Sequence, residues 1–244
     1  TEIPTPEAIG LPPATAQLLT RPHGLVLMTG PTGSGKSTTL AAMIGWINRH
    51  RPLHILTIED PIEYIHPPQT ALVNQREVGA DTVSFAEGLK AALREDPDVV
   101  LVGEMRDLET IQLTLTLAET GHLVFATLHT NDAAQTVDRV IDVFPADQQD
   151  QIRTQFSMAL AAVIAQRLIP RIGGGRVAAY EILMGTSASS NIIREGKIRQ
   201  LRNLIAMGQK DRMMVMAQSL ASLVATGIIT YEHALAASVH PDEI

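Results

Sequence analysis

The chain has 244 residues, of which 45% are hydrophobic, enough to bury one substantial core. A formal net charge of −7 and an aromatic content of 3% argue against a protein that holds nucleic acid by bulk positive charge and base stacking. The absence of cysteine excludes disulfides, a thiol nucleophile and a cysteine zinc site, which fits a cytosolic protein. No apolar run approaches the roughly 18 residues that a transmembrane segment needs, and we expect the longest run, 158–165, to belong to a core helix.

The amino end of the chain is rich in proline. It starts at Thr1 and runs through Ile3-Pro4-Thr5-Pro6, a composition that is typical of linkers between domains. We therefore expect residues 1–22 to be a linker that follows a domain absent from this sequence.

A phosphate-binding loop follows the first predicted strand. The strand is the apolar run 25–29, and apolar residues recur at helical spacing after Ser37. Between them, residues 30–37 fit the pattern G-x-x-x-x-G-K-[ST]. Glycines let successive backbone N–H groups point at one anion, Lys36 reaches the β- and γ-phosphates, and the Ser37 hydroxyl ligates Mg²⁺. The predicted nucleotide-binding residues are Gly30, Pro31, Thr32, Gly33, Ser34, Gly35, Lys36, Ser37 and Thr38.

Further strands and helices are predicted along the next hundred residues. Apolar runs alternate with segments of helical period at 55–58, 99–102 and 123–127. Runs that are apolar throughout are expected for parallel strands covered on both faces. Helix starts are marked by Ser84, which forms a capping box with Glu87, and by Asp107. The pattern predicts an α/β fold with a mostly parallel sheet flanked by helices, plus a small C-terminal helical unit.

Acidic residues follow two of these strands, at the carboxyl ends, where parallel sheets bind ligands. Glu104 comes after the third strand, in the position of an acid that holds Mg²⁺ through water. Hydrolysis also needs a carboxylate that orients the attacking water, and Glu63 or Glu59 is available after the second strand. An acid after a strand often caps a helix, which is the alternative for Glu59 and Asp60.

Two histidines flank the fourth strand. A single histidine is more often structural, but His122 and His129 lie on either side of a strand that ends beside the phosphates. We predict that both converge on the nucleotide.

Basic residues gather late in the chain. Residues 167–212 carry 9 Lys/Arg and 3 Asp/Glu, whereas residues 1–166 carry 10 and 20. This basic stretch is either a solvated face or a contact for an acidic partner, including the acidic half of a neighbouring copy.

Four signatures in order resemble the secretion ATPases of type II secretion and type IV pili, and within them the pilus retraction ATPases. They are the Walker A stretch, the aspartate box, the Walker B stretch and the histidine box, at 30–37, 57–63, 98–104 and 120–129. The resemblance covers residues 24–235. It implies a RecA-like P-loop NTPase core at 23–185, a C-terminal helical subdomain at 186–244, and ATP with Mg²⁺ as ligands. The loop pattern itself does not distinguish ATP from GTP.

The same resemblance implies roles for individual residues. Glu63 matches the catalytic glutamate that activates water, Glu104 matches the Walker B glutamate, and His122 and His129 match the histidines of the histidine box. The resemblance further implies a homohexameric ring, an N-terminal PAS-like domain ahead of this sequence, and arginines from that domain and from neighbouring chains. This fragment alone is then expected to hydrolyse ATP poorly. Inner-membrane pilus platform proteins are the implied partners, at the cytoplasmic face of the membrane.

Two features bear on the subtype. Extension and secretion ATPases commonly insert a four-cysteine zinc module late in the core, where this chain has only the stretch 172–175. The retraction motif corresponds to 188–195, although Ser189 and Ser190 replace an isoleucine and an arginine. We therefore predict a motor that hydrolyses ATP to retract a type IV pilus. The alternatives are an extension or secretion ATPase, a regulatory or structural ring component without turnover, and a nucleic-acid translocase, which the acidic charge disfavours.

Overall fold

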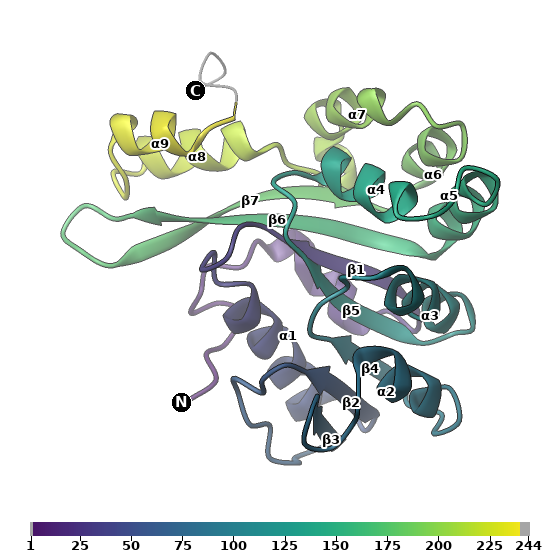
Figure 1. Cartoon of the computed structure of the whole chain (residues 1–244). Helices are drawn as coiled ribbons and strands as arrows, with labels where there is room; N and C mark the ends of the chain where they lie inside the picture. The colour runs from purple at the N-terminus through teal and green to yellow at the C-terminus, as the bar shows by residue number, and fades with distance from the viewer. Residues whose placement is uncertain (1, 240–244) are drawn as a thin grey trace.

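A seven-stranded sheet organises residues 2–239, the part of the chain that the computed structural model describes (Figure 1). The strand order is β3-β2-β4-β5-β1-β6-β7, and the pairs are parallel except for the antiparallel pair of β6 and β7. The strands are β1 (Gly24–Thr29), β2 (His54–Glu59), β3 (Leu72–Glu77), β4 (Val99–Val102), β5 (Leu123–Leu128), β6 (Leu160–Pro170) and β7 (Arg176–Met184).

Helices cover both faces of this sheet. The chain moves one way along the sheet from β1 to β2 and the other way from β3 to β5, so the right-handed crossover rule places α1 on one face and α2 and α3 on the other (Figure 1). The α-helices are α1 (Lys36–His50), α2 (Phe85–Ala92), α3 (Leu108–Glu119), α4 (Ala133–Asp142), α5 (Gln149–Ala159), α6 (Ser187–Arg194), α7 (Leu201–Met207), α8 (Met216–Ala225) and α9 (Tyr231–Ala237). Within residues 2–239, the 3₁₀ helices are η1 (Pro13–Thr20), η2 (Ile198–Gln200) and η3 (Gln209–Asp211).

The four predicted strands are confirmed as β1, β2, β4 and β5. Two predicted helix starts are confirmed by their caps as well. The Ser84 side chain accepts a hydrogen bond from the backbone N–H of Glu87 at 3.1 Å, and Asp107 accepts one from the backbone N–H of Thr110 at 2.9 Å. These signals are local, because a cap and the residue it bonds lie three positions apart.

The prediction of a core helix over 158–165 was wrong. Helix α5 ends at Ala159, and the apolar run continues as β6, which pairs with β1 on one side and β7 on the other. A short apolar run does not distinguish a buried helix from a strand covered on both faces. Figure 1 shows β6 and β7 as a long hairpin that extends beyond the rest of the sheet, with α8 and α9 along it.

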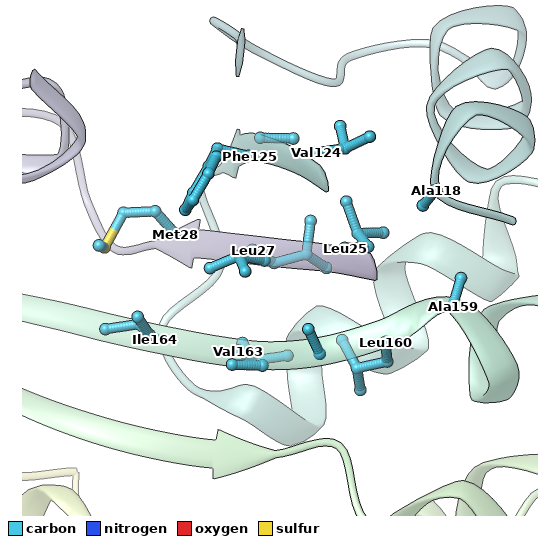
Figure 2. Packing of buried hydrophobic residues seen from close by; sticks show 14 of the residues in the cluster. Leu25, Leu27, Met28, Ala118, Val124, Phe125, Ala159, Leu160, Val163 and Ile164 are labelled. Carbon is cyan, nitrogen blue, oxygen red and sulfur yellow. The ribbon is translucent and has the colours of Figure 1, made fainter. Parts of the chain in front are cut away.

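The core lies between the central strands and their helices. Figure 2 shows apolar side chains of β1, β5 and β6 in one cluster, and the members labelled there include Leu25, Leu27, Phe125, Val163 and Ile164. All five are fully buried. Burial of this kind stabilises the fold by about 1.5–3 kcal/mol for each large side chain, and it fixes the strand ends from which the site is built.

The residues before β1 and the helices α6 and α7 pack against this core, whereas α8 and α9 form a second cluster with β6 and β7. Leu18 and Leu19 of η1, and Ile193 and Leu201 of the C-terminal helices, belong to the same hydrophobic cluster as the sheet. The division into 1–22, 23–185 and 186–244 stays a prediction. Among the described residues, no helix combines the length and the apolar character needed to cross a lipid bilayer.

Candidate active site

The loop between β1 and α1 has the backbone that its glycines predict. Gly30, Gly33 and Gly35 have φ angles of 143°, 78° and 87°. Gly30 also has no room for a side chain, because a Cβ there would lie 2.3 Å from the carbonyl oxygen of Gln166. The loop therefore curls tightly at the amino end of α1, where backbone N–H groups face outward to an anion.

Gln166 of β6 is hydrogen-bonded to this loop and to the first turn of α1. Its Nε2 donates to the Ser34 carbonyl at 2.7 Å, and its Oε1 accepts from the Thr39 hydroxyl at 2.8 Å. Gln166 and Ser34 are almost completely buried. No local sequence pattern predicts this contact, since its partners lie more than 120 positions apart in the chain.

The Lys36 ammonium lies at the centre of the loop. It donates to the carbonyl oxygens of Gly30 at 2.8 Å and of Pro31 at 3.1 Å. Burial lowers the pKa of Lys36, while the charges of Glu104 and Glu63 act in the opposite direction. A buried ammonium beside two carboxylates is well placed to bind phosphate oxygens.

The segment after β2 reaches the same loop. The Ser37 hydroxyl donates to Oε1 of Glu63 at 2.8 Å, and the Thr38 hydroxyl lies 3.0 Å from the Tyr64 hydroxyl. Ser37 and Thr38 stand in the first turn of α1, so these contacts bring the segment 60–66 against the amino end of that helix. Glu63 is exposed, which leaves its carboxylate accessible to water.

Glu104, which follows β4, belongs to the same site. Its Oε2 lies 2.6 Å from Arg106, and its Oε1 lies 2.9 Å from Nε2 of His129. The hydrogen bond from Arg106, with a further contribution from His129, lowers the pKa of Glu104 despite its partial burial. The carboxylate is therefore ionised at neutral pH and available to an ion or its water.

These groups enclose one cavity of about 430 Å³. Its lining combines the phosphate loop, the acidic residues after β2 and β4, and the start of β7. The lining residues are Thr32, Gly33, Gly35, Lys36, Ser37, Thr38, Glu59, Asp60, Pro61, Glu63, Phe85, Gly103, Glu104, Thr127, His129, Leu168 and Arg176. Arg176 was missed as a site residue, because the sequence showed it only as one member of a basic stretch.

The prediction that both histidines converge on the nucleotide was wrong for His122. His129 follows β5 and lines the cavity, whereas His122 precedes β5 and bonds to the Leu117 carbonyl at 2.9 Å. A six-residue strand spans about 20 Å. His122 therefore lies at the amino end of β5, whereas the cavity lies at the carboxyl end.

Glu59 and Asp60 do not cap a helix, because the chain after β2 continues as a loop to β3. Burial raises the pKa of Glu59, whose carboxylate accepts hydrogen bonds from Thr57 at 2.6 Å and Gln75 at 3.2 Å. Asp60 and Glu59 both line the cavity. Glu63 is thus the member of this group that contacts Ser37.

A glycine loop between a buried strand and a helix, a lysine at its centre and carboxylates at the ends of two neighbouring strands define a P-loop nucleoside triphosphatase. Comparison with known proteins agrees. Residues 11–218 match the family described as Type II/IV secretion system protein. This chain belongs to that family of ATPases, and its mostly parallel sheet is the RecA-like core.

Three similar proteins are informative. The type IV pilus retraction ATPase PilT of Pseudomonas aeruginosa is 56% identical over 230 residues, which are 94% of this chain and 67% of that protein. A twitching motility protein of Neisseria gonorrhoeae is 56% identical over 229 residues, or 93% of this chain and 61% of that protein. The crystal structure of the pilus retraction motor PilT with bound ADP has a TM-score of 0.94 and 54% identity, and covers 100% of this chain and 69% of that one. This chain spans about two thirds of the length of these curated relatives.

Proposed function

We propose that this chain is the ATPase core of a ring-forming motor that hydrolyses ATP to drive type IV pilus retraction. The observation that carries the proposal is the contact between Ser37 of the phosphate loop and Glu63, in a chain 56% identical to a pilus retraction ATPase. That contact brings a carboxylate suited to water activation to the helix end that holds the phosphates.

The residues of the cavity have different roles in ATP hydrolysis. Backbone N–H groups of the loop and the Lys36 ammonium bind the β- and γ-phosphates. Glu63 orients a water molecule in line with the γ-phosphorus and accepts its proton as the oxygen attacks. The bond from the γ-phosphorus to the bridging oxygen then breaks, which leaves ADP and phosphate. His129 fixes the Glu104 carboxylate beside the γ-phosphate.

The donor set around the loop fits Mg²⁺. This ion prefers oxygen ligands and commonly uses one or two protein groups together with phosphates and water. The Ser37 hydroxyl and, through water, the Glu104 carboxylate would hold it, and it would offset the negative charge of the phosphate oxygens.

Mechanical work by such a motor requires several copies of the chain in a ring. The two PilT-like relatives extend beyond this chain, and we infer a homohexamer in which an additional N-terminal domain and neighbouring subunits supply further arginines to the exposed cavity. ATP with Mg²⁺ would favour one arrangement of subunits and the products another, so hydrolysis changes which arrangement is stable. The ring would act on inner-membrane platform proteins of the pilus from the cytoplasmic face.

The two serines of the divergent motif have local structural roles. Ser189 is fully buried and forms a capping box with Thr186 at the start of α6, and the Ser190 hydroxyl donates to the Ser157 carbonyl at 2.7 Å. The Ser190 bond joins α6 to α5 and the Ser189 bonds hold the start of α6, and neither serine lines the cavity. Retraction therefore remains our proposal, with extension or secretion as the alternative within the same family.

Deleting the gene tests the direction of the motor. If the chain drives retraction, surface filaments will accumulate while twitching stops. Loss of filaments would instead assign it to extension. A phosphate-release assay on the full-length protein separates both motors from a ring component that binds nucleotide without turnover.

A further inference from the structure

The segment 60–66, which carries Glu63, is attached to the edge strand β3. Two side chains of β3, Gln75 and Glu77, bond directly to the backbone of this segment. They stand two positions apart, so both project from the same face of the strand. The attachment uses side chains, because the segment 60–66 belongs to no helix or strand.

Gln75 makes two of these backbone contacts and a third contact to the side chain of Glu59. Its Oε1 accepts from the backbone N–H of His66 at 2.7 Å. Its Nε2 donates to the Tyr64 carbonyl at 2.8 Å and to Oε1 of Glu59 at 3.2 Å. One amide therefore fixes the two residues that follow Glu63 by one and three positions, and ties them to the end of β2.

Glu77 fixes the other side of Glu63. Its Oε2 accepts from the backbone N–H of Ile62 at 2.9 Å. The backbone carbonyl of Glu77 accepts from the turn 80–82, and its N–H donates to Asp81 at 2.9 Å, so the strand end itself is braced. Glu63 thus lies between two fixed backbone positions, Ile62 and Tyr64.

We propose that Gln75 and Glu77 are positioning residues that hold Glu63 against the Ser37 end of the phosphate loop. This inference rests on the proposed function, in which Glu63 orients the attacking water. Neither side chain lines the cavity, so neither is expected to touch the nucleotide. A displacement of about 1 Å at a catalytic group can cost about 100-fold in rate. The bonds from Ser37 to Glu63 and between Thr38 and Tyr64 join side chains of this segment to α1, whereas Gln75 and Glu77 bond to its backbone.

Two variants remove the bonds while leaving the phosphate loop intact. In the full-length protein, Gln75→Met and Glu77→Leu are expected to lower kcat for ATP hydrolysis at least tenfold, with KM and ADP affinity changed by less than twofold. Glu77→Gln keeps an amide oxygen for the N–H of Ile62, and is expected to restore kcat to within about threefold of the parent. Arg76→Met is the matched control, because Arg76 projects from the opposite face of β3 and pairs with Glu95. Its kcat should stay within twofold of the parent.

Hydrogen exchange gives a readout that does not depend on turnover. The backbone amides of Ile62 and His66 should exchange at least tenfold faster in Glu77→Leu and Gln75→Met respectively, and at the parental rate in Arg76→Met. Equal exchange and equal kcat in all variants would overturn the inference. A parallel fall of kcat and ADP affinity, or a failure of Glu77→Gln to rescue, would also overturn it in favour of a general structural role. If the full-length parent protein hydrolyses no ATP, the proposed function fails, while the exchange result still tests the attachment.

Discussion

The Ser37 hydroxyl donates a hydrogen bond to the Glu63 carboxylate across 2.8 Å, although the two residues stand 26 positions apart in the chain. This contact joins the first turn of α1 to the segment after β2. A group suited to bind a metal–phosphate complex and a group suited to orient water are therefore adjacent, and their roles are separable by substitution.

Replacing Glu63 by glutamine should preserve binding and abolish turnover. The amide oxygen of Glu63→Gln still accepts from Ser37, but it cannot take the proton of the attacking water. We expect ADP affinity within threefold of the parent and a fall in kcat on the order of 100-fold or more. Steady-state phosphate release and nucleotide titration measure the two effects, with Glu87→Gln on the exposed face of α2 as the control. Parental turnover in Glu63→Gln of the full-length ring would move the water-activating role to Glu59 or Glu104.

Removing the loop lysine should strongly weaken ATP binding. The Lys36 ammonium is the charged group at the centre of the phosphate loop, and its loss removes charge-assisted hydrogen bonds worth about 1.5–3 kcal/mol each. We expect Lys36→Ala to weaken ATP affinity roughly 100-fold in a fluorescence titration. The exposed Lys90, which pairs with Glu87 and Glu109, supplies the control Lys90→Ala. Unchanged affinity in Lys36→Ala would contradict the assignment of the site.

Which parts of this site can be predicted from the sequence depends on how far apart in the chain the interacting residues lie. The phosphate loop, the caps at Ser84 and Asp107, and the acid Glu104 follow from neighbouring residues, and the structure has them where they were predicted. The prediction for His122 was wrong because a residue that precedes a strand and a residue that follows it lie at opposite ends of that strand.

Contacts between distant segments were not predictable in this way. Gln166 lies under the phosphate loop only because β6 pairs beside β1, and that pairing was hidden by an apolar run that fits a helix equally well. Arg176 reaches the cavity because β7 returns along β6. Strand order determines both placements, and strand order has no local signature.

The position of Arg176 yields a third prediction. Arg176 lines the same cavity as the phosphate loop and the acidic residues, and the ion pairs found among the described residues do not include it. A guanidinium in that place favours phosphate binding. We expect Arg176→Ala to weaken ATP affinity about tenfold while adenosine affinity stays constant. Arg194→Ala, on α6, should change neither, and an equal loss for adenosine would exclude a phosphate contact.

His66 should make the stability of the fold depend on pH. The side chain is 4% exposed and lies beside the positive charge of Arg49, and burial followed by that charge lowers the pKa of His66 to about 4. The unfolded chain takes up this proton near pH 6.5, so the folded state loses stability as the pH falls from 6.5 to 4. A difference of this size corresponds to about 3 kcal/mol. Urea unfolding at pH 7.0 and 4.5 should show a loss that is smaller in His66→Leu by roughly that amount. His23→Leu, at an exposed position, should follow the parent, and an identical pH dependence in His66→Leu would contradict the prediction.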